Sequence, residues 1–205
     1  YWTLTFGETK HYDPVSLRPE LRDYVIFIDG LSKAFSATGV RVGWSFGPKY
    51  IIDKMKSILS HIGAWAPKAE QIASAKYLEN QESVGLFIGE IKTRIAARLF
   101  SFHQGFQQLK ALGFPVDSIQ PQGAIYLTVQ FALHGKKTAT GDILETTSDI
   151  TRFLLDEANL GLVPFYAFGT SIESVWYRLS VGTCNSKDIE PIIQKIHLAL
   201  ESLKK

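Results

Sequence analysis

A lysine surrounded by small residues and followed by an arginine is the feature of this sequence best suited to chemistry. Lys33 comes just after the apolar run 24–28, whose β-branched and aromatic residues predict a buried strand. Gly30 and Gly39 would let the backbone and a ligand approach closely. An amine drawn out of water among cationic groups loses its proton more easily and can form an imine with a carbonyl group. Because the planar Arg41 side chain binds oxyanions, the stretch predicts a site for a phosphorylated carbonyl compound.

A second arginine, Arg178, lies in the run 176–181, which predicts another strand. Such an arginine either forms a salt bridge on a sheet surface or binds a carboxylate, and the residues alone leave both readings open. The five histidines of the chain show no metal-ligand spacing, so no metal site is predicted.

Composition narrows the class of protein. The chain has 205 residues, of which 45% are hydrophobic and 20% charged, typical of a globular protein with one large or two small domains. The formal charge of +2, without a basic stripe, argues against nucleic-acid binding. No apolar run approaches about 18 residues and no charged leader precedes one, so no membrane association is expected. The single cysteine, Cys184, excludes an internal disulfide and favours a reducing, cytoplasmic setting.

The first half of the chain must position the lysine. After an irregular stretch at 2–23, the patterns predict strands at 24–28 and 41–46. A helix with Pro48 in its first turn should follow and end near Gly63, and a second helix should follow Ala66-Pro67 and run to about Asn80. A proline-free segment, 83–112, then predicts one long amphipathic helix. Its apolar stripe consists of Ile91, Ile95, Leu99, Phe102, Phe106 and Leu109.

Gly113 ends that helix and is taken as the domain boundary, which gives domains of residues 1–112 and 113–205. Alternating apolar residues predict a strand at 125–131. Ser148 is expected to cap a helix that runs to about residue 160 and is closed by Gly161, and Asn185 or Ser186 to cap the last helix. The second half therefore reads as a small α/β domain.

The lysine stretch resembles a known motif. The pattern Gly-Leu-Ser-Lys-x-x-Ser-Ala-x-Gly-x-Arg-Val-Gly at 30–43 resembles the pyridoxal-phosphate lysine motif of class I and II aminotransferases, which belong to the fold-type I group. The resemblance implies an α/β fold: the C-terminal part of the large cofactor-binding domain, including the long interdomain helix, followed by the small C-terminal domain. The segment 122–126, Gln-Gly-Ala-Ile-Tyr, resembles the start of a small-domain strand in this family and is read as structural.

The same resemblance assigns roles to five residues. Lys33 would form the imine with pyridoxal 5'-phosphate and then act as general base and acid. Arg41 would bind the cofactor phosphate, with Ser32 as a further donor. Tyr1 matches the tyrosine that hydrogen-bonds the ring hydroxyl of the cofactor, and Arg178 matches the arginine that holds the substrate α-carboxylate.

The function implied is amino transfer between an amino acid and a 2-oxo acid in a homodimer. The family's aspartate, which keeps the ring nitrogen protonated, would precede Tyr1 by three residues, so we expect the chain to be the C-terminal half of such an enzyme and inactive alone. A pyridoxal-phosphate-dependent β-lyase or decarboxylase of the same fold is an alternative. A non-catalytic, aminotransferase-like regulatory module is another, and an upstream DNA-binding segment would favour it.

Overall fold

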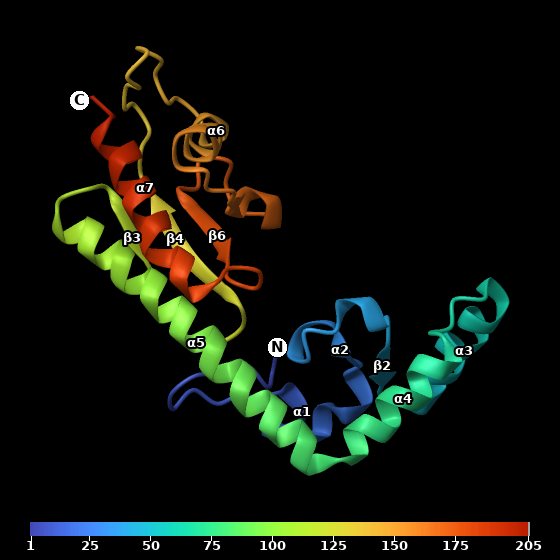
Figure 1. Ribbon diagram of the computed structural model, residues 1–205. Coiled ribbons are helices and arrows are strands. Elements are labelled where there is room, and N and C mark those ends of the chain that lie inside the picture. Colours follow the sequence, from blue (N-terminus) through green and yellow to red (C-terminus); the bar gives the residue numbers. More distant parts are fainter. Residues whose placement is uncertain (205) are drawn as a thin grey trace. The chain divides into compact units, whose positions relative to one another are not determined.

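The computed structural model describes residues 1–204 and contains two compact units, Tyr1–Lys92 and Thr93–Lys205. Both are built from helices and strands, as the α/β class requires (Figure 1). The long helix predicted at 83–112 is confirmed as α5 (Gln81–Ala111), and the division between the units falls within it. Of the predicted stripe, every member from Ile95 onward is buried.

The first unit is organised around a two-stranded antiparallel ribbon. Strand β1 (Phe27–Gly30) pairs with β2 (Gly43–Phe46), and the rings of Phe27 and Phe46 stack with centroids 4.8 Å apart. The short helix α2 (Leu31–Ala34) and the 3₁₀ turn η2 (Thr38–Val40) connect the two strands. The ribbon therefore holds the lysine stretch as its connection.

The segment before the ribbon is more regular than its sequence suggests. It contains α1 (Pro14–Leu17) and the 3₁₀ helix η1 (Pro19–Tyr24). The Asp13 carboxylate accepts hydrogen bonds from the N–H groups of the first turn of α1, and a proline begins each helix. Because η1 extends to Tyr24, the first strand begins at Phe27, and the prediction of a strand from residue 24 was wrong at that end.

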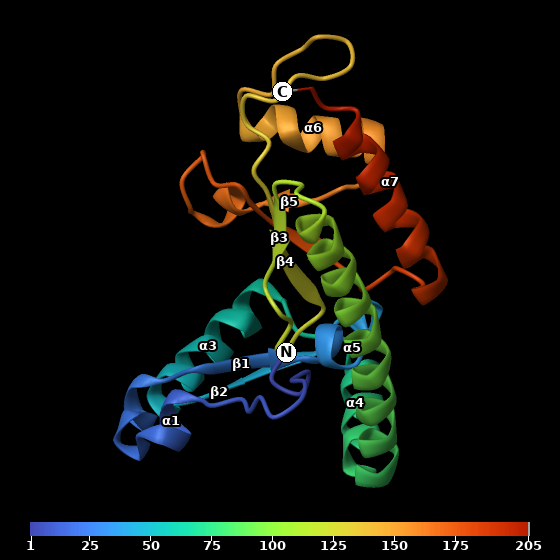
Figure 2. The same cartoon turned by 90° about the vertical axis from the view of Figure 1, so that its left-hand side faces the viewer.

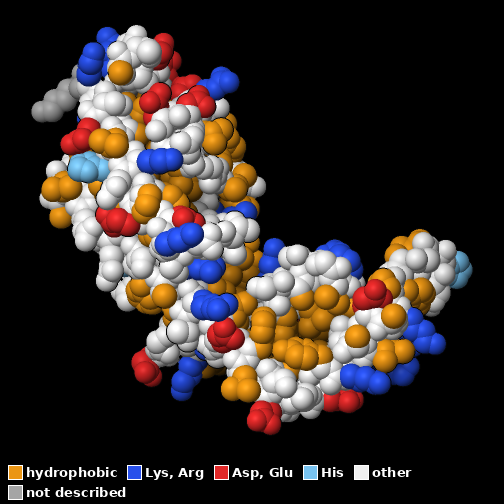
Figure 3. Space-filling view, in the orientation of Figure 1, with side chains coloured by type: hydrophobic (Ala, Val, Ile, Leu, Met, Phe, Trp, Pro, Cys, Tyr) orange, Lys and Arg blue, Asp and Glu red, His pale blue; other side chains and the backbone are white. Residues whose placement is uncertain are grey.

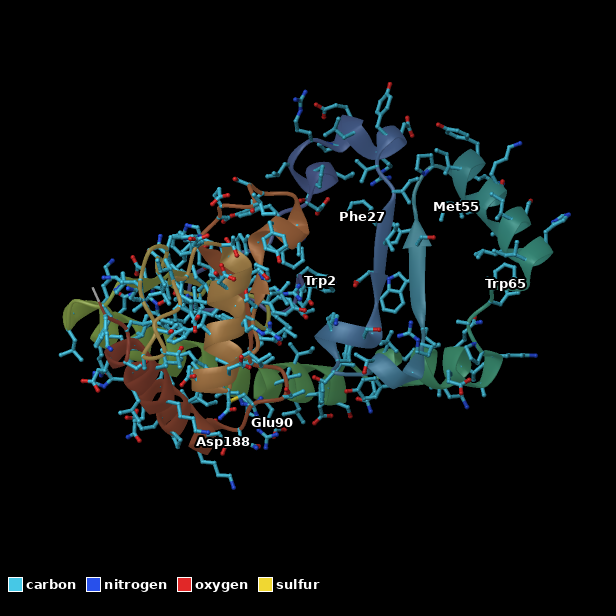
Figure 4. The ribbon with its side chains drawn as sticks, turned by 90° about the horizontal axis from the view of Figure 1, so that it is seen from above. Trp2, Phe27, Met55, Trp65, Glu90 and Asp188 are labelled. Carbon is cyan, nitrogen blue, oxygen red and sulfur yellow. The ribbon has the colours of Figure 1, made fainter. Side chains whose placement is uncertain are left out.

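The two predicted helices that follow the ribbon are confirmed as α3 (Lys49–Ile62) and α4 (Lys68–Glu79). Pro48 and Pro67 immediately precede them, and Gly63 ends α3 in the left-handed conformation. Helix α3 lies beside the ribbon, as Figures 2 and 4 show with Met55 and Phe27 labelled in the second of these views.

The second unit contains a four-stranded, wholly antiparallel sheet. Its strands are β3 (Val116–Ser118), β4 (Tyr126–Phe131), β5 (Val163–Pro164) and β6 (Trp176–Ser180), in the order β3-β4-β6-β5. Helix α6 (Thr147–Ala158) packs against α7 (Ile189–Glu201), while α7 and the second part of α5 lie side by side along the sheet (Figure 1).

Alternation along the two central strands gives the sheet a buried face and an opposite face. On β4, Leu127, Val129 and Phe131 are buried, and on β6 so is Tyr177. The Phe131 ring meets the Phe106 ring of α5 edge-on at 5.6 Å and the Tyr177 ring at 5.9 Å. The residues between them, including Arg178, lie on the other face of the sheet.

The structure corrects three helix boundaries. Thr146, not Ser148, caps α6, because Thr146 and Asp149 form a reciprocal capping box. Asn159 ends that helix in the left-handed conformation, two residues before Gly161. A 3₁₀ turn, η4 (Ser186–Asp188), precedes α7, so neither Asn185 nor Ser186 caps the last α-helix directly.

Among the described residues, neither a helix that could span a membrane nor a cluster of metal-binding side chains is present. No helix of residues 1–204 is long and apolar enough to cross a bilayer. No group of three His, Cys, Asp or Glu side chains within the same residues could hold a metal ion. Acidic and basic side chains are interspersed over the second unit on the face seen in Figure 3.

Candidate active site

The lysine and the first arginine lie at the same end of the ribbon. Strand β1 ends at Gly30 and β2 begins at Gly43, and these two residues pair across the antiparallel ribbon. The Leu31 N–H donates a hydrogen bond of 3.2 Å to the Val42 carbonyl, which closes the connection. The connection includes Ser32, Lys33 and Arg41, so strand pairing alone brings these three predicted residues to one end.

An aromatic cluster fixes this connection to the helices of the first unit. The Phe35 ring stacks parallel to Phe87 of α5 and meets Tyr77 of α4 edge-on, each with a centroid distance of 6.1 Å. Leu31 and Ala34, on the buried side of α2, add further apolar contact area. A cavity of about 380 Å³ is lined in part by Leu31 and the three rings. Lys33 thus projects from a short helix whose opposite side is packed.

The two cations of the connection have no acidic partner within residues 1–204. The Lys33 side chain is exposed, and its amine forms no hydrogen bond or ion pair with those residues. Arg41 is exposed and left-handed (φ 57°), and its Nη1 donates a hydrogen bond of 2.9 Å to the Thr38 carbonyl of the same loop. Their charge is therefore available to an anionic ligand. In the first unit Lys33 is not drawn out of water as the sequence reading expected.

Asp29 carries the carboxylate nearest to Lys33 in the sequence, and that carboxylate is hydrogen-bonded to other groups. Oδ2 of Asp29 accepts a hydrogen bond of 2.7 Å from Nε1 of Trp2, and its Oδ1 accepts one of 2.8 Å from the Gly30 N–H. This contact ties the first residues of the chain to the end of β1. Tyr1, the exposed neighbour of Trp2, lies on that tethered segment, which is visible in Figure 4 with Trp2 labelled.

The donor set of the first unit fits pyridoxal phosphate. A primary amine without an ion pair matches an aldehyde, and a guanidinium that has no carboxylate partner matches a phosphate. Ser32, half-buried on the same short helix, adds a hydroxyl group. These groups come from one 12-residue connection, so its backbone geometry determines their spacing.

Arg178 lies at the centre of the sheet of the second unit, on the face opposite the core. It pairs with Thr128 of β4 on one side and with Val163 of β5 on the other. The guanidinium carbon is 4.4 Å from the Tyr126 ring centroid and 4.8 Å from that of Phe168. Within residues 1–204 Arg178 forms no ion pair, and its buried Nε has no hydrogen-bond partner. The salt-bridged reading therefore has no support among these residues.

Two features of these sites were not anticipated from the sequence. Tyr126 was read as structural, and no role was predicted for Phe168, although both rings contact Arg178. The only sequence feature that points to Phe168 is its position just before Gly169, which adopts a left-handed conformation (φ 91°) at the end of η3 (Phe165–Phe168). The hydrogen bond between Trp2 and Asp29 joins residues 27 positions apart, and no sequence pattern indicates it.

Relatives of the chain identify its family. Residues 1–196 match the family described as Aminotransferase class I and II. An aspartate aminotransferase from Geobacillus stearothermophilus is 32% identical over 203 residues, which cover 98% of this chain and 48% of that protein. A probable aspartate/prephenate aminotransferase from Rickettsia bellii is 28% identical over 204 residues, with 99% and 48% covered. The chain belongs to the class I and II aminotransferases, whose members use pyridoxal phosphate.

Solved structures agree with this assignment. The aspartate aminotransferase of Rhizobium meliloti superposes with a TM-score of 0.83 at 25% identity, covering all of this chain and 48% of that one. The aspartate aminotransferase of Thermus thermophilus, solved with maleate, superposes with a TM-score of 0.77 over 97% of this chain and 46% of its own; at 24% identity it supports the fold alone. The chain spans about half the length of the relatives it matches.

Proposed function

We propose that the protein transfers an amino group between an amino acid and a 2-oxo acid with pyridoxal phosphate as cofactor. The observation that supports this most directly is the placement of Lys33 and Arg41 on one connection of the ribbon, where neither has an acidic partner among residues 1–204. Family membership supports the same reading.

In this proposal the residues of the connection bind and orient the cofactor. Pyridoxal phosphate, when bound, supplies an aldehyde carbon and an electron-withdrawing ring. Lys33 would hold the cofactor through its amine, and in amino transfer its Nζ would accept and return a proton. Arg41 and Ser32 donate hydrogen bonds to the phosphate oxygens, and Tyr1 donates one to the ring hydroxyl. Arg178 holds the α-carboxylate of the substrate through paired N–H donors.

Replacement of the lysine tests this proposal. In the protein expressed from its complete gene, Lys33→Ala should abolish transamination and the visible absorption band of the bound cofactor. Lys49→Ala is the matched control, because Lys49 is an exposed lysine of the same unit that already pairs with Asp53. We expect that variant to behave like the wild type. Full activity of Lys33→Ala would contradict the proposal.

Further parts of the proposal concern assembly and location. Residues 1–112 would contribute to the large domain and 113–205 would form the small one, and transamination would need residues outside this chain. A homodimer is supported by exposed apolar residues of the first unit, such as Ile28 (80%) and Ile62 (66%).

The unpaired thiol of Cys184 suits a cytoplasmic location. Light scattering would measure the oligomeric state, and assays of residues 1–205 alone would test the requirement for the rest.

A further inference from the structure

The guanidinium of Arg178 is oriented without donating a hydrogen bond to any of residues 1–204. Its guanidinium carbon lies over the rings of Tyr126 and Phe168, at 4.4 and 4.8 Å from their centroids. A cation–π contact attracts the charge to the face of the ring and leaves every N–H group unused. A carboxylate partner would orient the side chain equally well, but it would neutralise the charge and occupy those groups. Arg178 therefore keeps its charge and its donors for a ligand.

The two rings come from different elements, so the arrangement depends on the fold. Tyr126 begins β4 two residues before Thr128, the cross-strand partner of Arg178, and strand alternation places all three on one face. Phe168 ends the 3₁₀ helix η3 (Phe165–Phe168), where the Phe165 ring meets it edge-on at 6.1 Å. Nε of Arg178 is buried without a partner, so the terminal nitrogens are the donors that a ligand reaches.

We propose that Tyr126 and Phe168 are positioning residues that hold the Arg178 guanidinium so that its terminal nitrogens receive the substrate carboxylate. This rests on the proposed role of Arg178 as the carboxylate-binding residue. Loss of either ring leaves the guanidinium free to rotate, so each binding event must fix that rotation again. The rings act through Arg178 and not on the reacting atoms, so their loss should weaken substrate binding more than it slows turnover.

The test replaces each ring in the protein expressed from its complete gene and loaded with cofactor. Tyr126→Leu and Phe168→Leu should each raise the KM for the amino acid and the Kd for maleate, measured by calorimetry, about tenfold. The kcat should change less than about threefold. Tyr126→Phe and Phe168→Tyr keep the rings, and both should stay within about twofold of the wild type. Phe114→Leu, which removes a ring that packs on His197 elsewhere in the unit, is the matched control.

A second arm separates this proposal from the role of Arg178 itself. On an Arg178→Ala background the ring replacements should add nothing further, because their effect passes through the missing guanidinium. If Arg178→Ala raises the KM and the Kd but neither leucine variant does, the positioning role is wrong and the carboxylate role stands. If Arg178→Ala itself leaves both constants unchanged, the carboxylate role is wrong. Equal losses in Tyr126→Phe and Tyr126→Leu would assign the effect to the hydroxyl and overturn the positioning role of that ring.

Discussion

Gly30 and Gly43 face each other across the β1–β2 ribbon, and a Cβ atom on Gly43 would lie 2.9 Å from the Asp29 carbonyl oxygen. That distance is shorter than any relaxed contact, so a side chain there must separate the strands. A Cβ on Gly30 would meet the Cα of Gly43 at 3.1 Å. Both glycines of the lysine motif therefore permit the close strand pairing that positions Lys33.

Replacement of one of these glycines should loosen the site. We expect Gly43→Ala to lower the free energy of unfolding by about 1–3 kcal/mol, because the added methyl group must displace backbone. Cofactor retention should fall with it. Gly39→Ala is the matched control from the same motif, since a Cβ on Gly39 meets nothing within 4 Å. Urea unfolding and gel filtration with cofactor would measure both effects, and equal stability of the two variants would contradict the account.

The contact between α5 and α7 depends on another glycine. A Cβ on Gly105 would lie 2.6 Å from Cγ1 of Ile193, a β-branched side chain that rotates with difficulty. We expect Gly105→Ala to destabilise the protein by about 1–3 kcal/mol. Gly85→Ala in the same helix, where a Cβ meets nothing within 4 Å, should stabilise it by about 0.5–1 kcal/mol.

Truncation of Ile193 tests whether its contact with the new methyl group causes the loss of stability. In the double variant Gly105→Ala/Ile193→Ala, the loss should be smaller than the sum of the two single losses, because the new methyl group fills space that Ile193 vacates. Thermal and urea unfolding provide the four values of the cycle. Strict additivity would show that the two side chains do not interact.

A buried hydroxyl should make the protein sensitive to alkali. Burial raises the pKa of Tyr177 to about 12, although its contact with the Thr151 hydroxyl lowers it in part. Because the folded pKa exceeds the unfolded value of about 10, this stability is present below pH 10 and is lost as pH rises toward 12. The loss for a shift of this size is about 1.4 kcal/mol at pH 11.

Tyr177→Phe removes the titrating group. The variant should keep most of the wild-type stability at pH 8, and it should lose less stability at pH 11 because the titrating hydroxyl is gone. Tyr24→Phe, at a residue that is 84% exposed, should keep the alkaline loss of the wild type. Urea midpoints at the two pH values decide the matter. An unchanged alkaline loss in Tyr177→Phe would place the responsible group elsewhere.

Much of the fold could be predicted because neighbouring residues in the sequence determine where its helices begin and end. Prolines and glycines delimit α3 and α4, and the stripe of α5 continues without interruption for many turns. The cap of α6 was misassigned because Thr146 and Ser148 both carry hydroxyl groups near the start of the helix, but only Thr146 has an aspartate three residues later. Strand β3, with three residues, is too short for alternation to reveal it.

The site residues likewise fall into those that a local motif predicts and those that depend on tertiary structure. Lys33, Ser32 and Arg41 lie on one connection, so a linear motif sufficed to find them. The rings around Arg178 depend on the pairing of β4 with β6, whose register across about 50 residues is not readable from either strand. The hydrogen bond from Trp2 to Asp29 depends on chain folding in the same way.

The identity of the lysine that binds the cofactor is the most direct test of the central claim. Borohydride reduction of the protein expressed from its complete gene fixes the cofactor on the lysine to which it is attached, and peptide mapping then locates the label. The account predicts one labelled peptide, with the modification on Lys33, and no label in the Lys33→Ala variant. A label on Lys49 or Lys68 in the wild type, with Lys33 unmodified, would contradict it.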